Sequence, residues 1–179
     1  ETQMNRMNRI IQGILDIEKM TILSIDRISC SPDELVRNAV KELEVFASDR
    51  QVIVDVEIDR NVPSVWVDQQ QFERVLVNVI ENAVKFSPQD GRVSVAVSQV
   101  DGMIEFRISD NGVGIPSDIS SRVFDRFYRG NQPGIEHVTG SGLGLSLVRS
   151  IVENHQGKVW FESASGEGTT FFIRMASSS

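Results

Sequence analysis

Hydrophobic residues recur every three or four positions in four stretches of the chain, which is the spacing of an α-helix buried along one side. The strongest pattern lies between residues 69 and 86, where one helical face collects Phe72, Val75, Leu76, Val79, Ile80 and Ala83. Further helices are predicted at residues 3–22, 31–48 and 145–156. The second of these begins with Ser31-Pro32-Asp33-Glu34, a capping serine followed by a proline and two acidic residues, which is typical of a helix start.

Alternation of apolar and polar residues predicts β-strands in much of the remaining sequence. The expected strands cover residues 52–58, 92–99, 103–109, 158–164 and 169–175, and shorter extended segments cover 26–30 and 64–67. Asp101-Gly102 provides the turn of a hairpin. Because strands and helices are interleaved, we expect an α/β (α+β) two-layer sandwich. It would have a mixed, largely antiparallel five-stranded sheet covered on one face by about three helices, plus an N-terminal helix.

Length and composition indicate one folded domain with an additional element. The chain has 179 residues, of which 40% are hydrophobic and 24% charged. Its 18 basic and 25 acidic residues give a net charge of −7, which disfavours non-specific binding of nucleic acid. The lone Cys30 excludes an internal disulfide, and no apolar run approaches the roughly 20 residues of a membrane span. We therefore expect a cytoplasmic domain without membrane contact, and a membrane-anchored parent protein is compatible with this.

A polar stripe borders the apolar face of the helix predicted at residues 69–86. Arg74, Asn78, Asn82 and Lys85 recur every three or four residues and therefore line up along the helix. The amide oxygen of Asn82 suits a hard cation such as Mg²⁺, and Lys85 offers a positive charge for a phosphate. A solvated helix face is the alternative, but asparagine is a weak helix former and an unusual choice for one.

Two glycine-rich motifs follow. Asp110-Asn-Gly112-Val-Gly114 comes directly after a strand, where a carboxylate can accept a hydrogen bond from an exocyclic amine and glycines let a flat ring approach; a simple turn is the alternative. Gly140-Ser141-Gly142-Leu143-Gly144-Leu145 opens a helix, where backbone N–H groups can surround a phosphate. This second motif is neither a Walker phosphate loop nor a dinucleotide fingerprint, and a close-packed helix start is its alternative.

The order of these motifs resembles that in the ATP-binding catalytic domain of two-component sensor histidine kinases. The resemblance rests on Asn78-Val-Ile-Glu-Asn82-Ala-Val-Lys85-Phe86, the Asp110 motif, Phe124-Asp-Arg-Phe127-Tyr128-Arg129 and the Gly140 motif, and it covers roughly residues 31–175. It implies the Bergerat-type ATPase fold and a site for ATP and Mg²⁺. Residues 25–176 would be the kinase domain, and 177–179 a tail.

The resemblance also implies a role for each matching position. Asn82 would ligate Mg²⁺ with support from Asn78, Lys85 would contact a phosphate, and Phe86 would stack on adenine. Asp110 would bind the adenine amine, helped through water by Thr169 or Thr170. Gly112, Gly114 and Ile115 would form the wall of the pocket. The backbone on the phosphate side would come from Gly140, Ser141, Gly142, Leu143, Gly144 and Leu145. A lid would cover about residues 116–139, and Tyr128 and Arg129 end the phenylalanine-rich motif within it, with Arg129 near the γ-phosphate.

Asn78 separates two subclasses within the superfamily. Chaperone, topoisomerase and mismatch-repair ATPases have a glutamate there as a general base, whereas an amide cannot accept a proton in that role. The sequence therefore favours phosphoryl transfer, with Asn78, Lys85 and Arg129 as catalytic residues, over hydrolysis. The expected enzyme is a protein histidine kinase that passes the phosphoryl group to a response regulator.

The residues depart from the family pattern in two respects, the first being Phe86 where the family often has tyrosine. His137-Val-Thr and His155-Gln-Gly do not match the family's phosphoacceptor, which is usually followed by an acidic residue. Residues 1–24 resemble the second helix of the dimerisation hairpin, so the phosphoacceptor helix and the dimer partner would have to come from elsewhere in the parent kinase. Two alternatives stay open, a nucleotide-binding regulatory module without catalysis and a serine protein kinase of the same superfamily.

Overall fold

The computed structural model describes residues 25–128 and 141–178. The helix predicted at 3–22, with the hairpin role given to residues 1–24, lies outside the described residues. So do Arg129, Gly140 and the second half of the expected lid.

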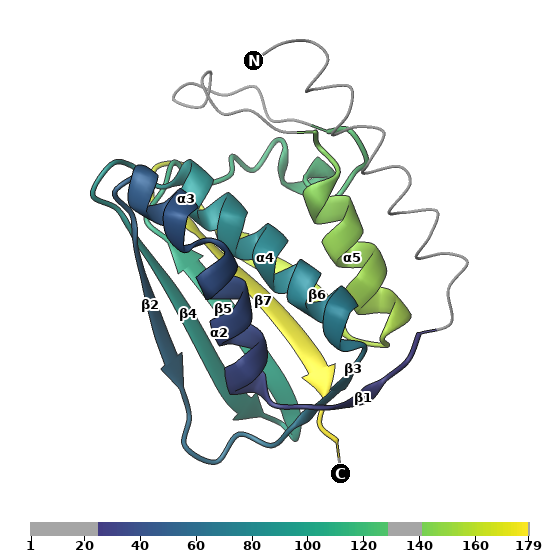
Figure 1. The fold of residues 1–179 in the computed structure, drawn as a ribbon. Helices are drawn as coiled ribbons and strands as arrows, with labels where there is room; N and C mark the ends of the chain where they lie inside the picture. Colours follow the sequence, from purple (N-terminus) through teal and green to yellow (C-terminus); the bar gives the residue numbers. More distant parts are fainter. Residues whose placement is uncertain (1–24, 129–140, 179) are drawn as a thin grey trace.

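A five-stranded sheet in the order β2-β4-β5-β7-β6 forms the centre of the fold (Figure 1). Its strands are β2 (Ile53–Ile58), β4 (Arg92–Val100), β5 (Met103–Asp110), β6 (Lys158–Ser163) and β7 (Thr169–Ala176). β2 runs parallel to β4, and the other three pairings are antiparallel. The mixed, largely antiparallel sheet expected from the sequence is confirmed.

Helices cover one face of this sheet (Figure 1). They are α2 (Pro32–Glu42), α3 (Glu44–Asp49), α4 (Gln69–Phe86) and α5 (Gly144–Asn154), and a 3₁₀ turn, η1, spans Ser120–Arg122. The sequence predicted one helix from 31 to 48, but Leu43 leaves the helical conformation at φ −96° and ψ 1°. Its N–H donates to the Val40 carbonyl at 3.1 Å, and the resulting bend buries both Leu43 and Ala47 while Val45 stays 72% exposed.

A second, two-stranded sheet closes one end of the domain. β1 (Ile28–Cys30) pairs antiparallel with β3 (Val65–Val67). Ser177 forms a β-bridge with Val65, and the Ser178 N–H donates to the Ser64 carbonyl at 2.8 Å. Residues 177 and 178, which the sequence placed in a tail, are thus hydrogen-bonded to the domain.

α4 supplies the central layer of the core. Its apolar face is buried against the sheet, where the Phe72 ring meets Phe106 of β5 edge-on with 5.0 Å between centroids. The side chain of Asp68 caps the helix by accepting the Gln71 N–H at 3.1 Å. Because only one face is buried, the polar stripe of α4 stays half-exposed along the helix.

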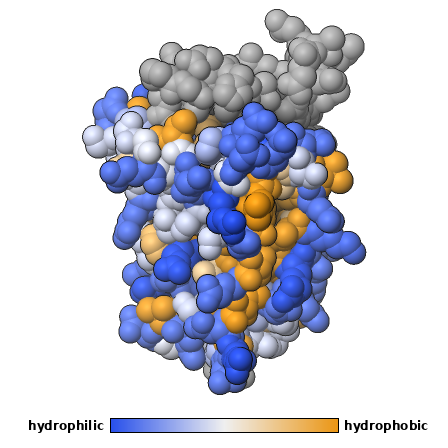
Figure 2. Space-filling model, turned by 90° about the vertical axis from the view of Figure 1, so that its left-hand side faces the viewer, coloured by the Kyte–Doolittle hydropathy of each residue, from blue (hydrophilic) through white to orange (hydrophobic). Residues whose placement is uncertain are grey.

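An apolar strip marks the side of the molecule where β2 forms the sheet edge (Figure 2). We use the name β2 strip for five half-buried side chains from α2, α3 and β2, namely Val40, Phe46, Val54, Val56 and Ile58. Polar surface borders it on both sides (Figure 2).

His155 joins the C-terminal end of α5 to the start of α4. The ring is buried, its Nε2 accepts the Asp68 N–H at 3.0 Å, and its Nδ1 lies 2.8 Å from the Ile151 carbonyl. Both contacts are made by a neutral ring protonated on Nδ1. Burial lowers the pKa of His155, because desolvation disfavours the charged form.

This arrangement predicts acid sensitivity. The folded-state pKa lies below the ordinary value of 6.5, so the unfolded chain binds the proton first and the free energy of unfolding falls as pH drops below about 6.5. His155→Phe should lower the free energy of unfolding by about 1–3 kcal/mol at pH 7.5, because it leaves the Asp68 N–H unpaired. It should also reduce the decrease in the free energy of unfolding between pH 7.5 and 5.5. Urea unfolding at both pH values measures this. Glu153→Gln, on the exposed side of α5, is the matched control, and an unchanged pH dependence in His155→Phe would contradict the assignment.

Candidate functional site

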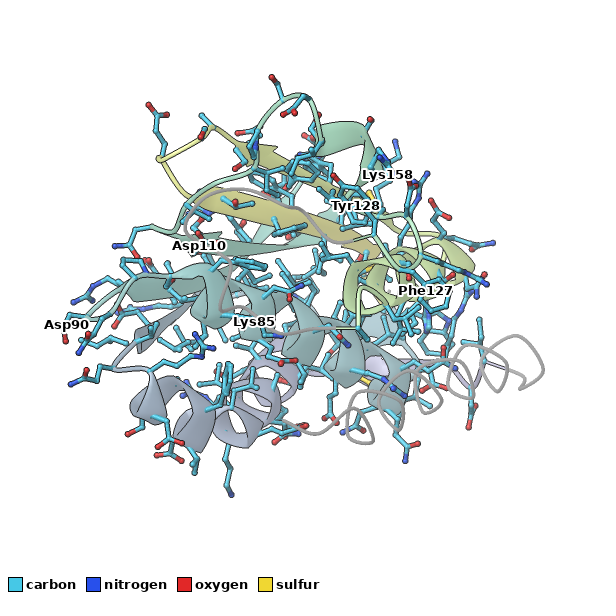
Figure 3. All side chains as sticks on the ribbon, turned by 90° about the horizontal axis from the view of Figure 1, so that it is seen from above. Lys85, Asp90, Asp110, Phe127, Tyr128 and Lys158 are labelled. Carbon is cyan, nitrogen blue, oxygen red and sulfur yellow. The ribbon has the colours of Figure 1, made fainter. Side chains whose placement is uncertain are left out.

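The candidate site lies along the polar stripe of α4 and the loops that meet its two ends (Figure 3). Asn78 and Phe86 are eight residues apart, which places them about 12 Å apart along the helix axis. Lys85 and Asp110 lie near the C-terminal end of α4, and Phe127 and Tyr128 lie toward α5 (Figure 3). The site therefore has two ends, one at Phe86 and one at Asn78, with Asn82 and Lys85 between them.

Asp110, at the end of β5, organises the first end. Its Oδ1 accepts the N–H groups of Gly112 at 2.8 Å and Thr169 at 3.2 Å. Its Oδ2 accepts no hydrogen bond from the described residues. Burial raises the pKa of this carboxyl to about 6, although the two backbone hydrogen bonds act in the opposite direction.

Close backbone approaches shape the wall beside Asp110. Gly112 lies against the Phe86 carbonyl, which leaves no room for a Cβ, and Gly114 lies equally close to the carbonyl of Ala164. The N–H of Ile115 donates to the Ser163 Oγ at 2.8 Å, and its side chain packs against the core. These contacts fix the loop between the end of α4 and the turn that joins β6 to β7.

At the other end, the start of α5 meets Asn78. A Cβ on Gly144 would lie 2.8 Å from the Asn78 Oδ1, so the start of α5 closely approaches the Asn78 side chain. The Asn78 Nδ2 donates to the Arg74 carbonyl at 2.8 Å. No side chain caps α5, whose N-cap residue is the buried Leu143. Leu145 packs against the core. The first N–H groups of the helix thus keep the partial positive charge that favours an anion.

Phe127 and Tyr128 are held against the same loop. The Phe127 N–H donates to the Gly142 carbonyl at 2.9 Å, and Gly142 has a φ of +72°. The Tyr128 ring lies under the guanidinium of Arg122, 4.5 Å from its centroid. Ser141 accepts the N–H of Leu143 at 3.3 Å. The end of the phenylalanine-rich motif therefore lies beside Gly142 of the glycine-rich motif.

Asn82 and Lys85 occupy the middle of the site. Both are half-buried, and the Asn82 carboxamide makes no hydrogen bond to any described residue. The Lys85 Nζ lies 3.0 Å from the Glu81 carboxylate, one turn earlier on α4, and its side chain is 14% exposed. The sequence did not predict this ion pair, which offsets the charge of Lys85.

Ser109 and Ser163, which the sequence analysis did not name, also support the site, and Thr169 acts differently from the expectation. The Thr169 backbone N–H reaches Asp110 directly rather than through water, whereas the Thr170 hydroxyl pairs with Ser109 at 2.9 Å. The Ser163 Oγ donates to the Gly168 carbonyl at 2.7 Å and lies 2.9 Å from the Thr169 hydroxyl. An antiparallel pairing of the last strand with β5, had it been predicted, would have placed Thr169 opposite Asp110 and so indicated this contact.

Together these groups suit an adenine nucleotide with its phosphates toward α5. The Asp110 Oδ2 can accept a hydrogen bond from an amine, and the glycines leave a flat wall without side chains. The N–H groups at the start of α5 can bind an anion. Among residues 25–128 and 141–178, no three His, Cys, Asp or Glu side chains converge on a metal site. The Asn82 carboxamide offers an oxygen donor of the kind that Mg²⁺ prefers, so it would hold such an ion together with phosphate and water ligands.

Comparison with known families decides the assignment. Residues 67–178 match the family described as "Histidine kinase-, DNA gyrase B-, and HSP90-like ATPase", which is more than half of the chain. The chain belongs to this family. The ATPase-family domain is 40% identical over 134 residues to the adaptive-response sensory-kinase SasA of Prochlorococcus marinus, and 34% identical over 174 residues to the sensor protein kinase WalK of Staphylococcus aureus. These alignments cover 74% and 95% of the chain but only 36% and 41% of the relatives' lengths.

Solved structures share the fold. The mycobacterial sensor histidine kinase MprB superposes with a TM-score of 0.73 at 30% identity, covering 86% of this chain and 98% of that one. The histidine kinase ThkA, solved in complex with the response regulator TrrA, gives a TM-score of 0.80 at 20% identity over 98% of this chain and 49% of ThkA. The second likeness shows the fold alone. In the described part of the ATPase-family domain, no helix is long and apolar enough to cross a membrane.

The buried Asp110 carboxyl predicts a pH-dependent stability of opposite sign to that of His155. Its folded-state pKa of about 6 exceeds the ordinary 3.8, so the unfolded chain loses its proton first and the free energy of unfolding falls as pH rises from about 4 to 6. Asp110→Asn keeps an oxygen for Gly112 and Thr169, and should be more stable than wild type by about 1–3 kcal/mol at pH 7.5. Urea unfolding and a ¹³C NMR titration of the carboxyl test this. A carboxyl that titrates near 4 would contradict it.

Proposed function

We propose that this domain is the catalytic part of a sensor histidine kinase that transfers the γ-phosphoryl group of Mg-ATP to a histidine on a hairpin helix outside these residues. A response-regulator aspartate would then receive the group. The observation that carries the proposal is Asn78. It stands at the phosphate end beside Gly144, where hydrolysing members of the superfamily have a glutamate, and its amide cannot activate water.

Adenine would lie between the Asp110 loop and the end of α4. The open Asp110 Oδ2 would accept the adenine amine, and the half-exposed Phe86 would contact the ring. Gly112 and Gly114 leave the wall free of side chains, and Ile115 closes it on the core side. The requirement for an ionised acceptor at Asp110 supports ATP binding above about pH 6.

The triphosphate would extend along α4 to the start of α5. The backbone of residues 140–145 would donate to phosphate oxygens, and Lys85 would exchange Glu81 for a phosphate. Asn82 would hold Mg²⁺, supported by Asn78, and the ion would neutralise charge on the phosphates during transfer. Because the structure describes neither Arg129 nor Gly140, their contacts with the γ-phosphate and the phosphate chain rest on the family resemblance.

Phosphoryl transfer needs positioning and charge neutralisation more than covalent chemistry by the protein. An imidazole nitrogen would attack the γ-phosphorus, a P–N bond would form, the bond to the ADP oxygen would break, and the ring would release its N–H proton to solvent. Lys85 and Arg129 would stabilise the transferring group, with Tyr128 beside them at the end of the lid. His155 is buried and bonded through both nitrogens, which supports an acceptor on another helix.

The partners follow from the same proposal. Residues 1–24 would be the second helix of the dimerisation hairpin, and residues 25–176 the kinase domain. Similarity to WalK, SasA and MprB, which are named as sensor kinases, and to ThkA, solved with its response regulator, supports a phosphorelay. We place the domain on the cytoplasmic side, where ATP is available.

Labelling in trans tests the transfer reaction. The chain is incubated with γ-³²P-ATP and a separately produced dimerisation hairpin of the parent kinase, and acid-labile, alkali-stable label on the hairpin histidine is expected. Asp110→Asn should reduce labelling at least about tenfold at subsaturating ATP, because its Nδ2 would meet the adenine amine donor to donor. A serine kinase would give acid-stable label instead, and absence of label with ATP binding intact would refute the transfer.

Calorimetric titration separates a catalytic site from a regulatory nucleotide module. ATP should bind more tightly when Mg²⁺ is added. Asn82→Ala should weaken the binding of ATP in the presence of Mg²⁺ at least about tenfold, while the affinity for metal-free ATP stays nearly unchanged. Asn38→Ala, on the exposed side of α2, is the matched control, because Asn38 hydrogen-bonds Glu73 and none of the proposed nucleotide ligands. Affinity that is independent of Mg²⁺ in the wild type would favour the regulatory module.

A further inference from the structure

β2 is an open edge of the sheet, and half of its backbone hydrogen-bonding groups point outward. Among residues 25–128 and 141–178, it pairs with β4 alone. The N–H groups of Ile53 and Asp59 donate to the Gly91 and Val97 carbonyls, each at 3.0 Å. In a parallel pair, every second residue of an edge strand directs its backbone N–H and C=O groups to the neighbouring strand. The residues between them direct their N–H and C=O groups to the free edge. These are Val54, Val56 and Ile58.

The same three residues carry the apolar side chains of the β2 strip. The exposed residues of the strand are Ile53, Asp55 and Glu57, on the sheet face that no helix covers. Val54, Val56 and Ile58 point instead toward α2 and α3, where Val40 and Phe46 continue the strip. The strip is visible from the edge side as an apolar band along the strand (Figure 2). An added strand would gain backbone hydrogen bonds and an apolar lining at once.

Acidic side chains accompany the strip on the uncovered face. Asp55 and Glu57 alternate with its apolar residues, and the exposed Asp59 follows. Arg92 of β4 forms an ion pair with Asp55, whereas Glu57 has no ion pair with any described residue. A strand laid along β2 would place its own alternate side chains beside these carboxylates.

This charge pattern decides between occupants. In a two-fold pairing of β2 with a second copy, centred on Val56, Asp55 would face Glu57 of the other chain, and such like-charge pairs are unfavourable. A strand with lysine or arginine at alternate positions would place opposite charges there instead. The negative charges therefore oppose self-association and favour a basic partner.

We propose that the β2 edge is a docking site for an extended partner segment in which apolar residues alternate with lysine or arginine. The segment adds a sixth strand beside β2, pairs with the backbone of Val54, Val56 and Ile58, and covers the β2 strip. Asp55 and Glu57 select its basic residues. This surface is independent of the proposed nucleotide site, so its test does not depend on that function.

A synthetic peptide tests the proposal directly. The probe is an acetylated heptapeptide of alternating lysine and valine, titrated into the ¹⁵N-labelled domain. We expect saturable shifts and slowed amide exchange at Val54, Val56 and Ile58. The peptide with glutamate in place of lysine should bind at least about tenfold more weakly. Equal binding of the two peptides, shifts centred elsewhere, or no binding at millimolar peptide would overturn the proposal.

Two protein variants locate the interaction. Val56→Pro removes one outward N–H and no bond to β4, so it should abolish peptide binding while the circular dichroism spectrum is kept. Glu57→Lys should weaken binding about fivefold and improve binding of the glutamate peptide. Glu162→Lys changes charge equally on β6, the opposite edge, and should leave both affinities unchanged. Equal effects of Glu57→Lys and Glu162→Lys would reduce the interaction to net charge and refute the site. A β2-mediated dimer in sedimentation, without peptide binding, would assign the edge to a second copy.

Discussion

The burial of one face of α4 against the sheet is the contact on which the rest of the structure depends. Phe72 fixes the helix on β5 through Phe106, and the Asp68 cap fixes where the helix begins. With its apolar face committed to the core, α4 can present only its opposite flank to a ligand. The polar residues Asn78, Asn82 and Lys85 are consequently held at fixed spacing along a rigid element, which favours a precisely positioned site.

Most of the fold could be predicted because its signals are local. The helical period at residues 69–86 and the alternation in the strands are written into consecutive residues, and the structure confirms the sheet with helices on one face. The break at Leu43 could not be foreseen in the same way, because it depends on which side chains the sheet can bury. The pairing of β1 with β3 is also non-local, since its partners lie between 35 residues (Cys30 and Val65) and 39 residues (Ile28 and Val67) apart in the sequence.

The site follows the same division between local and non-local information. Asp110 and Gly112 share a motif, so the short loop between them was predictable, but the Thr169 N–H reaches Asp110 from a strand 59 residues later. Glu81 was within the quoted motif, yet its pairing with Lys85 depends on side-chain geometry rather than residue order. Asn78 and Gly144 were each identified separately, and their contact required the packing of α5 against α4.

A net charge of −7 is compatible with a polyphosphate ligand because the domain separates its charges in space. Along the proposed phosphate path, positive character comes from the start of α5, which no described side chain caps. Lys85 would add its charge there only after exchanging Glu81 for a phosphate. At the proposed adenine end stands the Asp110 carboxylate, and burial makes its ionisation costly. A hydrogen-bond donor at the open oxygen would offset that cost, so the same desolvation would make the proposed adenine pocket discriminate in favour of an amine.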